Sequence, residues 1–273
     1  LALQLGNSHD ALYHLEKTSS LDPDNADAHY RLGLLHDSPE DFQKARSYLQ
    51  STVDFDPTHI EGHFQLGLHL RRGRRYDESG NLVDGGFDNE AQECFETALR
   101  LDPAHAAAHE ELAHIFAKTG ETVAAQDSFT SSIQNDPSRI TAYLSLASLR
   151  APDLAIQTCA EALNQDAVHP AVHLRKALFH LANKETSDAR HHFEKAAGNA
   201  IERIRAFKDE ALEALTENRF IPARKKEEQA TELSGHRAEA LFQLGLLAKD
   251  DASQRRQHFE AALAIDSQHP GAH

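Results

Sequence analysis

The chain of 273 residues contains no methionine, only two cysteines and no run of about 18 apolar residues, the length a membrane helix needs. Its first ten residues also lack the basic start and long apolar stretch of a signal peptide. Basic residues are few, because 28 lysines and arginines stand against 43 aspartates and glutamates, a formal charge of −15. This charge argues against general binding to nucleic acid or to anionic membranes. We therefore expect partners that are neutral, apolar or locally basic, and no direct membrane insertion.

What the chain does contain is an internal repeat. Asp-Pro recurs at residues 22–23, 56–57, 102–103 and 136–137, so the prolines are spaced by 34, 46 and 34 residues. With position 1 placed three residues after each proline, positions 7 and 8 read Leu32-Gly33, Leu66-Gly67 and Leu112-Ala113. Small residues return at positions 20 and 27, and a large apolar or aromatic residue returns at position 24. The repeat unit is therefore 34 residues long, and one copy carries 12 extra residues.

The order Leu-Gly, Ala-x-x-x-Phe/Leu-x-x-Ala and Asp-Pro resembles the tetratricopeptide repeat, a helix–turn–helix unit of 34 residues. The resemblance implies an all-α fold, a right-handed superhelical solenoid. The small residues let the two helices approach closely, and we expect the proline at position 32 to end the second helix. Because no alternating strand pattern occurs, we expect at least about two-thirds helix and no sheet.

The repeat predicts a single array over residues 1–273, with seven full copies and a partial copy at each end. Because the array shows neither a start cap nor a polar end cap and the chain lacks methionine, we expect it to be cut from a longer one. The expected segments are a partial copy at 1–25, full copies at 26–59, 60–105, 106–139, 140–169, 170–203, 204–237 and 238–269, and the start of another at 270–273.

From this resemblance we expect the chain to be a non-catalytic protein-protein interaction scaffold that helps to assemble a multiprotein complex. It would bind a partner helix or an extended peptide in a concave groove, which the family lines with positions 2, 5, 9 and 12 of the first helices. Those positions are mostly apolar here, and contiguous exposed apolar surface usually marks a partner site. The alternative is that neighbouring helices or a long following helix cover this face. The predicted groove residues are Tyr30, Leu34, Phe64, Leu68, Leu144, Leu174, Leu178, Leu181, Leu212, Leu215, Phe242 and Leu246.

A second hypothesis is that the chain is the recognition arm of a larger enzyme, such as a transferase, whose catalytic domain lies outside residues 1–273. No glycine-rich phosphate loop and no Ser/His/Asp arrangement stands out in the chain itself, so we expect no catalysis and no cofactor. Cys94 and Cys159 fall on second helices two repeats apart, too far for a disulfide. Free thiols favour a reducing cytoplasm, while a periplasmic or membrane-anchored location through missing ends stays open.

The insertion lies within residues 71–90 and changes from basic to acidic along its length. Its glycines and aspartates predict a loop, and loops on a rigid scaffold often carry recognition. The alternative is an idle insertion at a surface turn. The residues that we expect to contact a partner are Arg71, Arg72, Arg74, Arg75 and Tyr76.

Histidines recur at positions 34 and 4, on either side of the turn into the first helix. At position 34 a side chain can accept a hydrogen bond from a backbone N–H at the start of the helix, and position 4 is a half-buried packing site. A metal is the weaker explanation, because each pair offers only two ligands. The weak candidates for a metal are His59, His63, His105, His109, His169 and His173.

Overall fold

The structure, a computed structural model, describes residues 8–36, 41–73, 88–216, 220–248 and 251–271. Over these ranges it contains thirteen α-helices and no strand, and 84% of the described residues are helical. The expected all-α fold is therefore confirmed. The chain divides into two compact units, Leu1–Asp136 and Pro137–His273, which we call the first and second units. That residues 1–273 form a single array stays a prediction.

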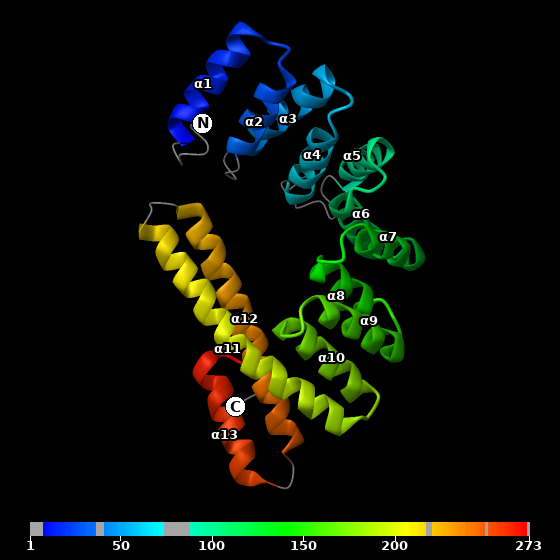
Figure 1. Ribbon diagram of the computed structural model, residues 1–273, viewed down its shortest axis with the longest axis vertical. Coiled ribbons are helices and arrows are strands. Elements are labelled where there is room, and N and C mark those ends of the chain that lie inside the picture. The colour runs from blue at the N-terminus through cyan, green and yellow to red at the C-terminus, as the bar shows by residue number, and fades with distance from the viewer. Residues whose placement is uncertain (1–7, 37–40, 74–87, 217–219, 249–250, 272–273) are drawn as a thin grey trace, which may run out of the picture. The chain divides into compact units, whose positions relative to one another are not determined.

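In the first unit, short helices of similar length follow one another and each packs against the next (Figure 1). The described helices are α1 (Ser8–Leu21), α2 (Ala26–Leu35), α3 (Phe42–Phe55), α4 (Ile60–Arg72), α5 (Asp88–Leu101), α6 (Ala106–Thr119) and α7 (Thr122–Asn135).

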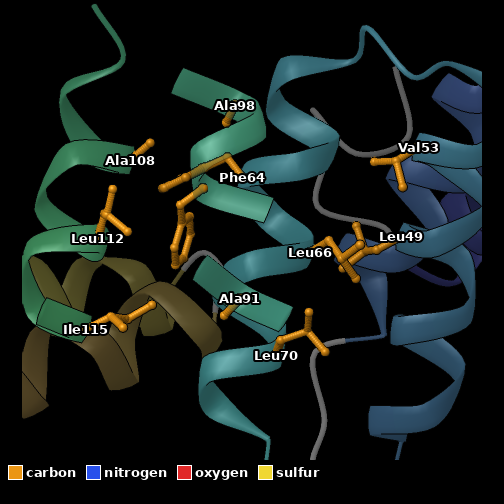
Figure 2. Packing of buried hydrophobic residues seen from close by; sticks show 11 residues of the cluster. Leu49, Val53, Phe64, Leu66, Leu70, Ala91, Ala98, Ala108, Leu112 and Ile115 are labelled. Atoms are coloured by element: carbon orange, nitrogen blue, oxygen red, sulfur yellow. The ribbon is translucent and has the colours of Figure 1, made fainter. Parts of the chain in front are cut away.

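Close approach between paired helices depends on the glycine at position 8. A Cβ atom built on Gly67 would lie 2.7 Å from a ring carbon of Phe95, and one on Gly33 would lie 2.7 Å from Leu49 Cγ. Phe95 is fully buried and belongs to a core cluster formed by α3, α4, α5 and α6. Figure 2 shows other members of this cluster. The Leu-Gly motif thus gives the large residue at position 24 the space it occupies.

An aspartate at position 31 follows the second helix of most copies. The Asp56 and Asp102 side chains accept hydrogen bonds from the backbone N–H groups of Thr58 and Ala104, both at 3.0 Å. In each case the aspartate's own N–H still bonds to the last turn of the helix. The side chain thus holds the chain in a turn just where the helix ends.

The second unit begins with short helices but continues with two long ones (Figure 1). The long helices pack against each other as an antiparallel hairpin, α11 against α12. The helices are α8 (Ile140–Ser148), α9 (Pro152–Gln165), α10 (Pro170–Ala182), α11 (Thr186–Thr216), α12 (Phe220–Leu247) and α13 (Ala252–Ile265).

The prediction of a helix–turn–helix in every copy is wrong at two places. α11 continues through residues 200–203 and α12 through residues 234–237, where turns between copies were expected. Ala200 and Ser234 stand at the position that holds aspartate in the other copies. Alanine has no side-chain acceptor, and the Ser234 hydroxyl donates to the Ala230 carbonyl of the same helix at 2.8 Å. Each second helix therefore runs on into the first helix of the next copy.

Candidate partner-binding site

A pocket of about 440 Å³ lies within the second unit, with α8 and α10 on one side and α11 and α12 on the other. Its walls are largely apolar. Leu144 comes from α8 and Leu174 from α10, while Phe207 and Leu233 come from the long hairpin. The volume falls in the range of pockets that bind small organic groups.

Polar groups line the same pocket. Arg175 and Glu232 are exposed and carry opposite charges, and Arg203 forms an ion pair with Asp166. Gln229 Oε1 is buried and makes no hydrogen bond within the described part of the chain. The pocket therefore combines an apolar surface with charges of both signs and an amide, rather than a single strong charge.

Two histidines of the pocket, His169 and His236, are neutral near pH 7. Burial, assisted by the positive charge of Arg203, lowers the pKa of His169 to about 4. Burial also lowers the pKa of His236, and Arg175 adds to this effect while Glu232 opposes it. Within the described residues neither Nδ1 atom has a hydrogen-bond partner. A neutral imidazole nitrogen can donate or accept, so these rings suit a ligand that carries both kinds of group.

The predicted groove residues of the second unit separate into three groups. Leu144, Leu174 and Leu178 line the pocket, but Leu174 is only 7% exposed and belongs to the core cluster of this unit, so its placement in an open groove is wrong. Leu181 and Phe242 are half-buried and pack against the core cluster of this unit. Leu212 and Leu246 are exposed by 63% and 45%, and the side chain of Leu215 lies outside the described residues.

The first unit offers less open surface than the sequence predicts. Leu34 is 43% exposed and lines a cavity of about 120 Å³ together with Leu68. Tyr30 and Leu68 are half-buried against the core. Phe64 is only 8% exposed, so its placement in an open groove is wrong. The His105 ring covers Phe64, with 4.6 Å between the ring centroids, and Figure 2 shows Phe64 inside the buried cluster.

The basic start of the insertion is described in part. Arg71 is half-buried and forms an ion pair with Glu111 of α6, and its burial lowers its pKa. Arg72 is exposed and lines the small cavity beside Leu34. Arg74, Arg75 and Tyr76 lie outside the described residues.

Histidines at position 34 precede three of the described first helices, α4, α6 and α10. In two of these three the histidine ring caps the helix, as expected. His59 Nδ1 accepts a hydrogen bond from the Gly62 backbone N–H at 2.8 Å, and His105 Nδ1 accepts one from Ala108 at 3.1 Å. His169 makes no such bond, so that expectation is wrong. Because His169 precedes a proline, its backbone is pushed toward a more extended conformation, with ψ 112° against 89° for His59 and 88° for His105.

The position-4 histidines connect each first helix to the turn before it. His63, His109 and His173 each donate from Nε2 to a backbone carbonyl six residues earlier, at 2.9–3.0 Å. In five of the six histidines named as weak metal candidates, at least one ring nitrogen already forms a helix cap or one of these hydrogen bonds to a turn. The structure thus gives these rings a role in joining helices to turns.

Neither cysteine is suited to nucleophilic chemistry. Both are free, and burial raises the pKa of Cys94 to about 11 and that of Cys159 to about 12. Near neutral pH both are therefore protonated thiols, and the thiolate is the nucleophilic form.

Residues 1–60 and 81–140 match the family model of the tetratricopeptide repeat. These two ranges thus carry tetratricopeptide repeats, as the Leu-Gly and Asp-Pro spacing indicated. No sequence among curated proteins matches it significantly. Within the described ranges, no helix combines the length and the apolar character needed to cross a membrane.

Solved structures of similar fold include three tetratricopeptide or related helical proteins. The C-terminal part of a TPR repeat-containing protein from Cytophaga hutchinsonii has 12% sequence identity and a TM-score of 0.66, covering 99% of this chain and 95% of that one. PilF of Pseudomonas aeruginosa has 17% identity and a TM-score of 0.53, covering 86% and 96%. YrrB, described as a TPR protein with an unusual peptide-binding site, has 15% identity and a TM-score of 0.52, covering 68% and 91%. These likenesses establish the fold.

Proposed function

We propose that this chain is a protein-interaction scaffold, and that its second unit binds an extended peptide segment of a partner protein. One apolar side chain of the peptide enters the pocket between α10 and the α11–α12 hairpin. The observation that carries this proposal is the pocket itself, whose walls come from Leu144, Leu174 and Leu178 on one side and from the hairpin on the other. The proposal assigns the chain a binding role without catalysis, as a component of a larger assembly.

The chemistry of the pocket supports an extended peptide over a nucleic acid or a strongly charged ligand. A peptide backbone carries alternating N–H and C=O groups, which match the Gln229 carbonyl and the neutral rings of His169 and His236. Arg175 and Glu232 offer one charge of each sign to neighbouring side chains of the peptide. The formal charge of −15 opposes binding of a phosphate backbone.

YrrB supports the peptide class of ligand, because its structure is described as containing a peptide-binding site on a similar fold. Burial of one large apolar side chain in the pocket would contribute about 1.5–3 kcal/mol. Loss of that contribution corresponds to a decrease in affinity of roughly 10- to 150-fold.

The test fills the pocket without altering the core. Thr141 is exposed and lines the pocket, so Thr141→Trp places a large ring at its edge. Leu154→Trp is the matched control, because Leu154 is 52% exposed on α9, a helix that contributes no lining residue. Peptides are selected on the wild-type chain from a random library, labelled with a fluorophore and titrated by fluorescence anisotropy.

We expect Thr141→Trp to weaken peptide binding by at least tenfold and Leu154→Trp to leave it unchanged. Circular dichroism of both variants verifies that the helices are retained. If the selected peptides bind Thr141→Trp as tightly as wild type, the pocket is not the binding site. If the library yields no binding peptide, the proposal of an extended peptide ligand is wrong.

A further inference from the structure

Three side chains of types that can bind a metal ion, His180, Glu185 and Asp188, come together at the turn between α10 and α11, away from the histidine pairs that the repeat produces. His180 lies in the last turn of α10, Glu185 directly precedes α11, and Asp188 lies in its first turn. One possible ligand atom from each lies within 4.8 Å of the other two. His180 Nδ1 and Glu185 Oε2 are 2.6 Å apart.

The backbone holds these three residues together. Lys184 adopts a left-handed conformation, with φ 65°, and this reverses the chain directly after α10. The Glu185 N–H then donates to the His180 carbonyl at 2.9 Å, and the Ala189 N–H donates to the Glu185 carbonyl at 3.0 Å. The first bond closes the end of α10 and the second begins α11. Glu185 is thereby fixed beside His180, and Asp188 follows three residues later on a neighbouring face of α11.

The imidazole is the most firmly held of the three ligands. Its side chain is only 12% exposed, and its ring stacks on His192 with 5.4 Å between centroids and 12° between planes. Glu185 is more open, with its side chain 45% exposed, and Asp188 is also exposed. When two ligand atoms each bind a tetrahedral ion at about 2.1 Å, these two atoms lie about 3.4 Å from each other. Small rotations of the exposed carboxylates around a fixed imidazole can reach this spacing.

The donor set selects a class of ion. A neutral imidazole with two carboxylates supplies one nitrogen, two oxygens and a formal charge of −2, which suits a divalent cation. The nitrogen disfavours Mg²⁺ and Ca²⁺, which take oxygen ligands, and the absence of a thiolate from the set disfavours softer ions. We propose that His180, Glu185 and Asp188 bind one divalent first-row transition-metal ion, such as Zn²⁺, and leave one coordination position or more to water.

The competing explanation needs no metal. His180 and Glu185 would form only a histidine–carboxylate ion pair, and Asp188 would only place a negative charge at the N-terminal end of α11. Asp188 separates the two explanations, because it makes no contact that the ion pair requires. Its replacement by asparagine should affect metal affinity but not the pairing of His180 with Glu185.

The experiment titrates Zn²⁺ into the apo chain by isothermal titration calorimetry and repeats the titration with Co²⁺ while recording absorption. The variants are Asp188→Asn and His180→Ala. His191→Ala is the matched control, because His191 is exposed on the same helix beside His192 but is not in the ligand group. Since the chain has 19 histidines, the decisive quantity is the one-to-one binding step that differs between variants.

We expect one Zn²⁺ per chain, with affinity at least tenfold weaker in Asp188→Asn and in His180→Ala and unchanged in His191→Ala. Circular dichroism verifies folding, and Asp188→Asn keeps the test valid should His180→Ala misfold. Equal affinity in wild type and Asp188→Asn would overturn the site. The lack of any one-to-one binding step would also overturn the site, and His180 and Glu185 would then form an ion pair only. The result is independent of the peptide pocket, because none of the three ligands lines it.

Discussion

His105, which caps α6, stabilises this helix through two interactions that substitutions can separate. His105 Nδ1 accepts a hydrogen bond from Ala108 at 3.1 Å, while its ring lies 4.6 Å from that of Phe64, centroid to centroid. His105→Ala removes both interactions. His105→Asn removes the ring but can keep the cap, because Asn25 occupies the same repeat position and caps Ala28 at 2.9 Å.

The magnitudes follow from these contacts. Loss of a helix cap costs about 1 kcal/mol, and loss of an aromatic contact costs about 0.5–1.5 kcal/mol. The His105–Glu61 interaction adds little, because the separation is 3.5 Å and the Glu61 side chain is 44% exposed. We therefore expect His105→Ala to destabilise α6 locally by about 2 kcal/mol and His105→Asn by about 1 kcal/mol.

Native-state hydrogen exchange measures this locally, at the amides of the first turn of α6. The Ala108 amide should exchange about thirtyfold faster in His105→Ala and only about fivefold faster in His105→Asn, while helices of the second unit keep their wild-type rates. The reasoning is refuted if the two variants lose the same protection at Ala108. Such a result would mean that the ring packing, and not the Nδ1 bond, holds the start of the helix.

Three further predictions concern protonation and packing. Because the unfolded chain protonates His169 near its ordinary pKa of 6.5 while the folded ring resists protonation down to about 4, the folded state loses stability as the pH falls through this window. His169→Asn should remove roughly 2 kcal/mol of that loss, after allowance for partial exposure, and so flatten the dependence of Tm on pH between 7 and 4. Gly67→Ala should destabilise the fold by about 1–3 kcal/mol, because its Cβ would lie 2.7 Å from Phe95. Gly235→Ala should instead stabilise it by about 0.5–1 kcal/mol, because this mid-helix glycine has no atom within 4 Å of the added carbon. Urea unfolding midpoints check both glycine variants, and shifts of the same sign would contradict the packing argument.

The repeat could be predicted from sequence because its signals are local. Gly33 and Leu49 occupy positions 8 and 24 of one copy, and a packed pair of helices requires a small residue opposite a large one. Helix continuity in the second unit was harder to see. Small and apolar residues recur at the same positions whether two helices with a turn or one long helix carries them. These positions could therefore not show that α11 and α12 each continue as one helix.

The candidate site could be predicted only in part. Register placed Leu144, Leu174 and Leu178 on one face, and the structure brings all three to one pocket. The opposite wall, including Phe207 and Leu233, could not be inferred from register because it depends on the long hairpin. Phe64 was misplaced for a related reason. A side chain at a groove position becomes core when a large ring from the next turn, here that of His105, covers it.

In the described copies a turn follows each aspartate at position 31, whether or not a proline comes next. α9 and α13 both end at an aspartate that no proline follows, Asp166 before Ala167 and Asp266 before Ser267. Both side chains accept a hydrogen bond from the N–H two residues later, at 3.3 and 3.0 Å.

Where this aspartate is replaced by Ala200 or Ser234, the helix continues. The continuation of α11 carries Arg203 and Phe207 to the pocket, and the stretch of α12 around Ser234 carries Leu233 and His236 there. The continuation of α11 past Ala200 therefore supplies two residues, and that of α12 past Ser234 supplies His236, to the wall opposite α8 and α10. The wall of the candidate binding site opposite α8 and α10 thus comes from the two copies that lack this aspartate.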